Sequence, residues 1–487
     1  MFQNFKNIKI LKMKFGWLLL VVIFVLILLR IPSLIEPEWY GDEGVYRVIG
    51  LSLSQGRDMY VGAFDNKPPL LFIIYTLFNS DLFWVKLSSL VFGIGALTFL
   101  FILAKGLFRK SRAVIISSLF FAIMFGLPVL EGNIANAENF MLVFTILSQM
   151  LVFYGVEKRS KFLFFAGVLF SLAFLIKIVA VFDFFASLVF ITALYSQAKK
   201  PLFLFLPDTK RLLLLAGFLI PVVIIFLYFF LHGTYSLFFD AAFASNISYV
   251  DVGNNFIFPL GLLFLKTIFL GIAVLILIIF SKKFKKSELF IYSWVLFALF
   301  SVFFSARPYT HYLLMLLPSF SLLVGHIFEK NNKVILSTVL TIIVVYLVLA
   351  NFKIYKKTAS YYQNYLSFVF ASKTANDYLY FFDANTPKNY NLAQFVKIKV
   401  AKNENIFLWG DDGQIYALSG KLPPGRYSVA YHILFYPNGI SDTKKAMDVQ
   451  KPKLLIRTKD FDEGIILKEG YQLLYIIDGA KIYERQS

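Results

Sequence analysis

The chain has 487 residues, of which 59% are hydrophobic and only 16% are charged, a balance that soluble proteins do not have. Its formal charge of +19 (48 basic minus 29 acidic residues) would suggest a nucleic-acid partner in a soluble protein. In so apolar a chain the distribution of these charges between loops matters instead, and we expect no nucleic-acid partner. The chain has no cysteine, which excludes disulfides, thiolate catalysis and cysteine-ligated metals. Together these features indicate a protein that resides in a lipid bilayer.

Apolar segments close to the length of a membrane-spanning helix recur along the first 352 residues. Four lysines precede the first apolar run and no small-residue cleavage site follows it, so we predict an uncleaved first span and a cytoplasmic N-terminus. About eleven spans are expected, near residues 15–31, 83–108, 113–130, 139–156, 162–178, 179–197, 212–231, 258–281, 288–304, 311–328 and 333–352.

Basic residues divide unequally between alternate loops, which supports this topology because they resist translocation. The loops predicted to be cytoplasmic carry Lys105, Arg109, Lys110, Arg112, Lys158, Arg159, Lys161, Lys199, Lys200, Lys210, Arg211, Lys282, Lys283, Lys285, Lys286, Lys330 and Lys333. The opposite loops have only Arg47, Arg57, Lys67, Lys177 and Arg307. We therefore expect a multi-pass protein of the plasma membrane, and an odd number of spans places the tail after residue 352 outside the cytoplasm.

Two domains are expected, a transmembrane domain over residues 1–352 with a long first outer loop at 31–81, and a small α/β domain over residues 353–487. The composition changes abruptly after residue 352, where Asp, Asn, Gly and Pro replace long apolar runs. Within this tail we predict a helix at Asn391–Ala401, strands at Asn405–Trp409 and Pro452–Arg457, and a hairpin from Leu473 to Tyr483 with its turn at Asp478-Gly479.

The first outer loop contains a predicted amphipathic helix that begins with two acids. Val45, Ile49 and Leu53 recur at helical spacing, a pattern typical of a helix lying along the membrane interface. Asp42 and Glu43 stand at its start. Carboxylates at membrane level often belong to a catalytic site, but a helix cap that complements the helix dipole explains them equally well.

Downstream, the segment Asp65-Asn66-Lys67-Pro68-Pro69-Leu70 precedes an apolar helix. The two prolines fix the direction of the chain and hold Asp65 and Lys67 at the entrance of this helix. Lys67 is thus a fixed cation at which a phosphate could bind. The alternative is a proline-initiated helix with a lysine that extends to the membrane surface.

Further charged residues are predicted on the same face. Glu138 begins the fourth span and would point into a cavity between the spans, although a capping role is as plausible. Lys177 and Asp183 favour a structural ion pair. The segment Arg307-Pro308-Tyr309-Thr310-His311-Tyr312 combines a guanidinium with an imidazole, which suits phosphate binding; the alternative is a turn with an arginine that extends to the surface. The single histidines His232 and His326 favour structural roles.

In this order and on one face, the loops resemble those of the membrane-embedded GT-C glycosyltransferases related to glycosyltransferase family 39. This group includes protein O-mannosyltransferases and the lipid A aminoarabinose transferase. The resemblance rests on Asp42-Glu43, Asp65-Asn66-Lys67-Pro68-Pro69-Leu70, Glu138, Arg307-Pro308-Tyr309-Thr310-His311-Tyr312 and, in the tail, Ile406-Phe407-Leu408-Trp409-Gly410.

The resemblance implies a GT-C fold and transfer of a sugar from a polyprenyl phosphate donor to a lipid, glycan or protein acceptor at the outer face. Asp42 matches the catalytic acid of the family, with Glu43 and Glu138 as further catalytic candidates. An acceptor hydroxyl needs such a carboxylate to take its proton. Lys67, Arg307 and Lys177 would hold the lipid phosphate.

The segment before Pro68 departs from the aminoarabinose transferases, in which an acid directly precedes Lys-Pro-Pro. Here Asn66 occupies that place and Asp65 lies one residue further back. Asp65 and His311 are therefore the candidate ligands if a divalent metal ion binds, and no other cofactor is expected.

Two other functions fit a chain with many spans. A flippase or transporter of lipid-linked sugars often has broken helices at the bilayer midplane, whereas the charges here lie in outer loops. A polymerase or ligase of lipid-linked glycans is the third candidate.

Overall fold

The computed structural model describes residues 2–158, 160–198, 208–247, 250, 262–329, 334–459 and 470–486. The chain forms two compact units. We call Met1–Ser33, Ser88–Tyr228 and Ile247–Thr358 the membrane unit, and Leu34–Leu87, Phe229–Asn246 and Ala359–Ser487 the loop–tail unit. The domain boundary at residue 352 stays a prediction. The loop–tail unit contains most of the first long loop as well as the tail. Arg159, Lys199, Lys200, Lys330 and Lys333, predicted on the cytoplasmic side, lie outside the described residues.

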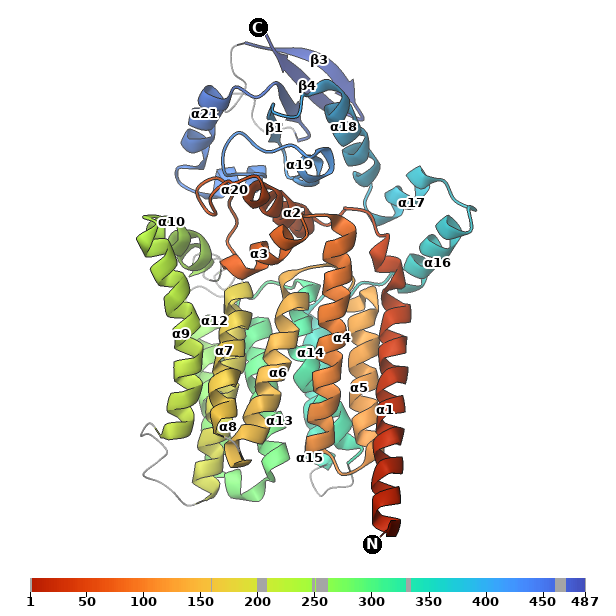
Figure 1. Ribbon diagram of the computed structural model, residues 1–487, viewed down its shortest axis with the longest axis vertical. Helices are drawn as coiled ribbons and strands as arrows, with labels where there is room; N and C mark the ends of the chain where they lie inside the picture. Colours follow the sequence, from red (N-terminus) through yellow and green to blue (C-terminus); the bar gives the residue numbers. More distant parts are fainter. Residues whose placement is uncertain are drawn as a thin grey trace. The chain divides into compact units, whose positions relative to one another are not determined.

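The membrane unit is a bundle of long apolar helices (Figure 1). Within the described residues, nine helical segments are long and apolar enough to span a membrane, and two shorter apolar helices, α5 and α7, bring the total to the predicted eleven. The helices are α1 (Phe2–Arg30), α4 (Leu82–Leu107), α5 (Ser111–Gly126), α6 (Ala137–Lys158), α7 (Lys161–Ile176), α8 (Val181–Gln197), α9 (Thr209–Leu231), α12 (Leu262–Ile279), α13 (Lys286–Phe303), α14 (Leu313–Ile327) and α15 (Val334–Asn351).

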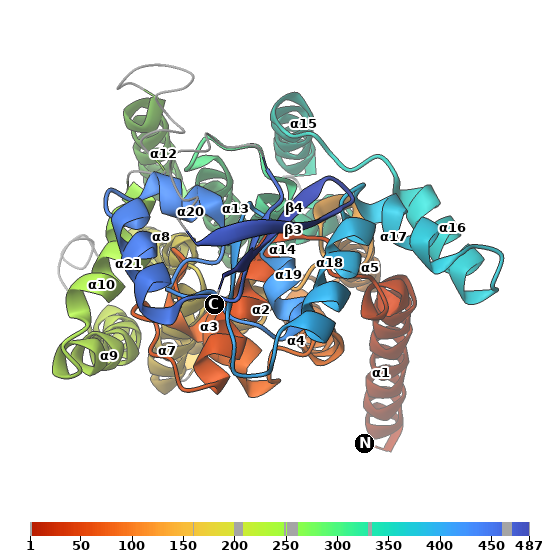
Figure 2. The ribbon, with the colours of Figure 1, turned by 90° about the horizontal axis from the view of Figure 1, so that it is seen from above.

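Burial identifies the inner and outer helices of this bundle. The segment Thr310–Ile327, which includes α14, has 83% of its span window buried, against 6% for α12 and 11% for α15. Seen from above in Figure 2, α1 and α12 lie at opposite edges of the bundle. The apolar surfaces of the outer helices are therefore available to lipid, whereas α14 packs against protein.

Two glycines bring α7 and α9 close together. A Cβ atom on Gly167 would lie 2.2 Å from the carbonyl oxygen of Leu214, and one on Gly217 would lie 2.0 Å from that of Phe164. Any larger residue would push the helices apart, which is why small residues are common at helix contacts in membranes.

The loop–tail unit contains a four-stranded sheet with helices around it. Its strands β1 (Ile406–Trp409), β2 (Leu454–Arg457), β3 (Tyr471–Ile477) and β4 (Ala480–Arg485) lie in the order β1-β2-β4-β3, with β1 and β2 parallel and the other pairs antiparallel. The helices are α2 (Gly41–Ser54), α3 (Pro69–Leu77), α10 (Tyr235–Phe239), α16 (Thr358–Val369), α17 (Ala375–Phe382), α18 (Thr386–Lys399), α19 (Gln414–Ser419), α20 (Ala430–Phe435) and α21 (Gly439–Gln450). The predicted helix, strands and hairpin are confirmed.

The hairpin turn follows from two residues. Asp478 and Gly479 have φ of 47° and 81°, as both central residues of a type I′ turn require, and Asp-Gly is a preferred pair for that turn.

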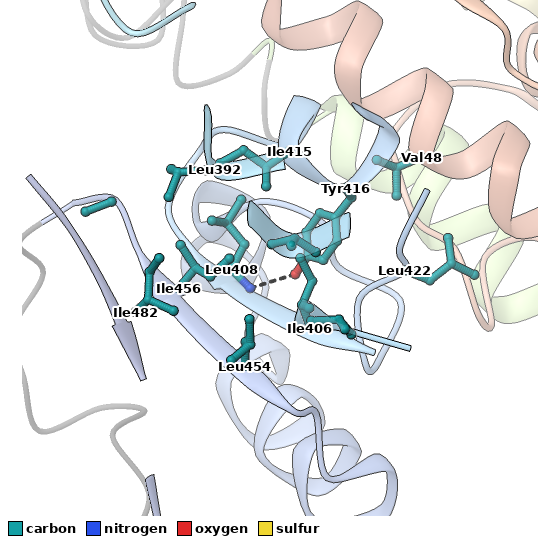
Figure 3. Packing of buried hydrophobic residues seen from close by; sticks show 13 residues of the cluster. Val48, Leu392, Ile406, Leu408, Ile415, Tyr416, Leu422, Leu454, Ile456 and Ile482 are labelled. Atoms are coloured by element: carbon teal, nitrogen blue, oxygen red, sulfur yellow. Dashed lines mark hydrogen bonds between the residues drawn. The ribbon is translucent and has the colours of Figure 1, made fainter. Parts of the chain in front are cut away.

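One hydrophobic core joins the first long loop to the tail. Val48 of α2 packs with residues of β1, β2, β4, α18 and α19, and the Leu408 backbone N–H at its centre donates to the Tyr416 hydroxyl at 2.8 Å (Figure 3). Val45 and Ile49 are buried as well. The helix forms as predicted, but its apolar face packs against protein and not against lipid. Its position along the membrane interface stays a prediction.

Candidate active site

Asp42 occupies the first turn of α2, where Tyr46 links it to Lys67. The Tyr46 hydroxyl, one turn further along α2, donates to Asp42 Oδ2 at 3.4 Å. The Lys67 ammonium lies 5.5 Å from the centre of the buried Tyr46 ring. The N-cap of α2 is Tyr40, so Asp42 does not cap the helix. Of the structural roles considered for Asp42, only a favourable interaction with the helix dipole remains.

Lys67 is held by its own loop, directly before the prolines that begin α3. Its ammonium donates to Asn66 Oδ1 at 2.8 Å and lies 3.5 Å from Asp65 Oδ2. The Lys67 carbonyl accepts from the hydroxyl of Tyr60, a buried residue with φ of 65°. A non-glycine residue in this conformation is strained and often lies at a functional site. The loop thus presents a positioned cation whose side chain keeps 20% of its surface exposed.

The neighbouring segment Phe229–Asn246 also fixes this loop. The Asn246 side chain donates to the Asn66 carbonyl at 2.8 Å and follows a π-helical turn, Asp240–Ala244. Such turns are rare and frequent at functional sites. Two separate parts of the chain therefore hold the backbone next to Lys67.

His432 of α20 reaches the same loop from the tail. Its Nε2 lies 3.5 Å from Asp65 Oδ1, and its buried Nδ1 has no hydrogen-bond partner among the described residues. Burial lowers the pKa of His432 to about 4, although Asp65 and Asp42 act in the opposite direction. The imidazole is therefore neutral at pH 7, and its contact with Asp65 is not an ion pair. We call Asp42, Tyr46, Asp65, Lys67 and His432 the Lys67 cluster.

Glu43 points away from solvent and pairs with a lysine that the sequence did not single out. Its Oε2 lies 3.3 Å from Lys86 Nζ near the start of α4, and both side chains are completely buried. This pair ties the first turn of α2 to α4, which supports a role for Glu43 in holding Asp42 in place. A catalytic role for Glu43 stays a prediction.

A second set of charged groups lies in the membrane unit. Glu138, in the first turn of α6, forms an ion pair with Lys177, and His311 Nε2 lies 3.9 Å from the same oxygen. His311 Nδ1 lies 3.1 Å from Glu131 Oε2. The Lys177 ammonium lies 4.4 Å from the centre of the Tyr312 ring. We call these five residues the Glu138 cluster; it brings together three of the predicted site residues, Glu138, Lys177 and His311.

The expected ion pair between Lys177 and Asp183 is not formed. Asp183 instead accepts from the Trp294 indole at 2.6 Å, inside the bundle. The physical reason is that Glu138 supplies the carboxylate for Lys177 from the adjacent helix α6.

Arg307 lies in the loop between α13 and the short turn Thr310–Tyr312, where it is half-buried. Ala306 before it has φ of 53°. The loop thus has a defined, strained conformation at the point where it presents the guanidinium.

The two candidate metal ligands fall in different compact units and contact other residues. Asp65 contacts Lys67 and His432, and His311 contacts Glu131 and Glu138. In the described part of the chain no group of three or more His, Asp or Glu residues is arranged to bind a metal, and two ligands do not complete a protein metal site. Metal binding by Asp65 and His311 stays a prediction, and we assign no step to a metal.

Sequence reasoning missed His432 and Glu131, which belong to these clusters. It also missed Lys86, which pairs with Glu43, and Asn246, which donates to the Asn66 carbonyl. Glu131 stands only seven residues before Glu138 in the sequence, but His432 and Asn246 lie far along the chain from the residues they contact. The signal for Lys86 was a lysine near the start of an apolar helix.

One protein-family model matches part of the chain. Residues 67–226, about a third of the chain, match the family model for dolichyl-phosphate-mannose-protein mannosyltransferases. No curated protein matches the chain.

One solved structure shows the fold of this chain, and a second is less similar. The structure of ArnT from Cupriavidus metallidurans bound to undecaprenyl phosphate is 14% identical, with a TM-score of 0.58 over 97% of both chains. The oligosaccharyltransferase AglB from Archaeoglobus fulgidus, in complex with an inhibitory peptide and a dolichol-phosphate, is 12% identical with a TM-score of 0.45, over 92% of this chain and 69% of AglB. The chain is a multi-pass membrane protein with the GT-C fold, and the predicted resemblance to GT-C glycosyltransferases is confirmed.

Proposed function

We propose that this chain is an integral-membrane glycosyltransferase that moves a sugar from a polyprenyl phosphate-linked donor to an acceptor at the outer face of the plasma membrane. The N-terminus then lies in the cytoplasm and the tail after residue 352 outside. Support comes from the GT-C fold shared with ArnT, whose structure was solved with undecaprenyl phosphate bound, and from the family-model match that begins at Lys67.

The observation that carries the proposal is the pairing of a positioned cation with a positioned carboxylate in the Lys67 cluster. Both residues contact Tyr46 in the same compact unit, Lys67 through the ring and Asp42 through the hydroxyl. A leaving phosphate needs a fixed cation as its charge develops, and an attacking hydroxyl needs a base within hydrogen-bond reach.

The reaction assigns one role to each group. The acceptor oxygen forms a bond with the anomeric carbon while the bond from that carbon to the phosphate oxygen breaks. Asp42 takes the proton of the acceptor hydroxyl, and the polyprenyl phosphate leaves with the bonding electrons, stabilised by Lys67. Lys177 and Arg307 of the membrane unit stay predicted phosphate-binding residues, and we assign Glu138 to holding Lys177.

The donor sugar is a hexose or a pentose, and the acceptor is a lipid, a glycan or a protein. Mass spectrometry of envelope glycolipids and glycoproteins from cells with and without this chain identifies both, because the missing sugar and the molecule that loses it appear in one measurement.

A transporter and a glycosyltransferase differ in what happens to the lipid-linked sugar donor. The purified chain in nanodiscs is incubated with undecaprenyl phosphate-linked sugars and an envelope extract, and free undecaprenyl phosphate is followed by mass spectrometry. A transferase releases it together with a newly glycosylated product, whereas a flippase leaves the lipid-linked sugar intact. The proposal fails if no polyprenyl phosphate appears from any donor while labelled donor changes leaflet in proteoliposomes.

A further inference from the structure

The helices α16 and α17 form a helical hairpin (Figure 1). Apolar side chains form a stripe on the exposed side of α16. Leu366 and Val369 of α16 are 49% and 50% exposed, and Phe370 directly after it is 77% exposed. Tyr362 precedes Leu366 by one turn and is half-buried. The spacing i, i+4, i+7 and i+8 places all four residues on one face of a helix.

The opposite face of α16 holds the hairpin together. Tyr361 and Asn364 are buried there, and the Phe368 ring stacks on Tyr378 of α17 with ring centres 4.2 Å apart. Since Tyr361, Asn364 and Phe368 make the contacts within the hairpin, the exposed stripe takes no part in its packing.

Hydrogen bonds fix the hairpin to the end of the first span. The Tyr361 hydroxyl donates to Glu36 Oε2 at 3.0 Å, and the Tyr378 hydroxyl donates to the Ile35 carbonyl at 3.3 Å. The first candidate span ends at Leu34, one residue before Ile35. The buried face of the hairpin therefore contacts residues that emerge directly from the membrane.

The last span reaches the same hairpin through a short connection. α15 ends at Asn351 and α16 begins at Thr358, so the connection extends at most about 25 Å. It contains Lys353, Lys356 and Lys357, which are exposed. Two span ends thus limit how far the hairpin can lie from the bilayer.

We propose that the stripe Tyr362, Leu366, Val369 and Phe370 inserts into the boundary between lipid head groups and acyl chains, on the membrane face where α1 and α15 emerge. Helices with one apolar face bind at this depth, and the lysines beside α16 complement anionic head groups, which attract basic residues near the surface. The proposal does not depend on the enzymatic activity.

The absence of native cysteine allows a direct measurement of depth. Leu366→Cys, Val369→Cys and Phe370→Cys are each labelled with the environment-sensitive fluorophore NBD in nanodiscs of phosphatidylcholine and phosphatidylglycerol. Val449→Cys is the matched control, because Val449 lies in α21 of the same compact unit and is 82% exposed. All four positions are exposed in the chain, and thermal unfolding of each labelled variant reports on its fold.

The expected result is a blue-shifted emission at residues 366, 369 and 370, with quenching by lipids that carry a nitroxide high on the acyl chain and loss of quenching by aqueous iodide. The label at residue 449 should show the reverse. Nanodiscs of phosphatidylcholine alone should reduce the nitroxide quenching at the stripe, and equal quenching in both lipids would overturn the role of the lysines.

Two outcomes would overturn the proposal itself. Iodide quenching at the stripe equal to that at residue 449 places the stripe in water. Protection from both quenchers in nanodiscs that hold a single chain means that protein covers the stripe.

Discussion

Glu43 Oε2 lies 3.3 Å from the ammonium of Lys86, and neither side chain reaches solvent. Glu43 directly follows Asp42 in the sequence. The ion pair therefore holds the turn of α2 that carries Asp42 against α4. Removal of one partner leaves an uncompensated buried charge, which costs about 3–5 kcal/mol.

We therefore predict that Lys86→Met lowers the thermal stability of the protein more than the double variant Glu43→Gln/Lys86→Met does. In the double variant no charge remains unpaired, so part of the stability returns. Thermal unfolding of both variants in nanodiscs measures the difference. Equal losses would show that the pair does not stabilise the fold as a unit.

Asp42→Asn should fold normally and lose transfer by about 10² or more, because the amide cannot accept a proton at neutral pH. Since Tyr40 and not Asp42 is the N-cap, the change costs at most the dipole contribution, about 0.3–1 kcal/mol. The assay is glycan transfer in membranes with equal amounts of each protein, with thermal stability measured beside it. Near-normal transfer would remove Asp42 from the mechanism and make Glu43 or Glu138 the next candidate.

Lys67→Met and Arg307→Met should each weaken binding of a polyprenyl phosphate sugar by about 1.5–3 kcal/mol, the contribution of a charge-assisted contact. The matched control is Lys402→Met, because Lys402 is an exposed lysine in the turn before β1. Donor titration of all three variants measures the effect. Affinities like that of the control would refute the phosphate assignment.

His432 makes part of the stability depend on pH. Burial lowers its pKa to about 4, against about 6.5 for an unperturbed histidine, so the unfolded chain binds a proton in this range that the folded chain does not. Stability present above pH 6.5 is thus lost as the pH falls toward 4, by about 3 kcal/mol in total. His432→Gln should reduce this loss. Unfolding of both proteins at pH 7, 5.5 and 4.5 measures it, and identical pH profiles would contradict the assignment.

The topology predicts which residues an external reagent can reach. Lys402→Cys in the tail should react with a membrane-impermeant maleimide in intact cells, whereas Lys282→Cys between α12 and α13 should react only after permeabilisation. The wild-type chain has no cysteine and gives no background. The reverse pattern would overturn the orientation and with it an active site at the outer face.

Local patterns in the sequence predict much of this fold. The spans follow from apolar runs, and the β3–β4 hairpin from Asp478-Gly479. Contacts between distant segments do not follow from such patterns, because nothing in the sequence around His432 or Asp65 specifies the other. The same limit applies to α2. Its apolar face has the same sequence pattern whether it contacts lipid or, as Val48 does, the core of the tail.

The position of Val48 in the tail core sets an order of assembly during synthesis. Translation proceeds from the N-terminus, so Leu34–Leu87 is complete hundreds of residues before Ala359–Ser487 leaves the ribosome. Until then Val48 lacks the tail residues against which it packs, and α2 has only partners such as Phe72 and Tyr75 of α3. A ribosome that stalls before α18 is made therefore leaves a chain whose spans can all insert but whose Val48 stays uncovered by the tail core.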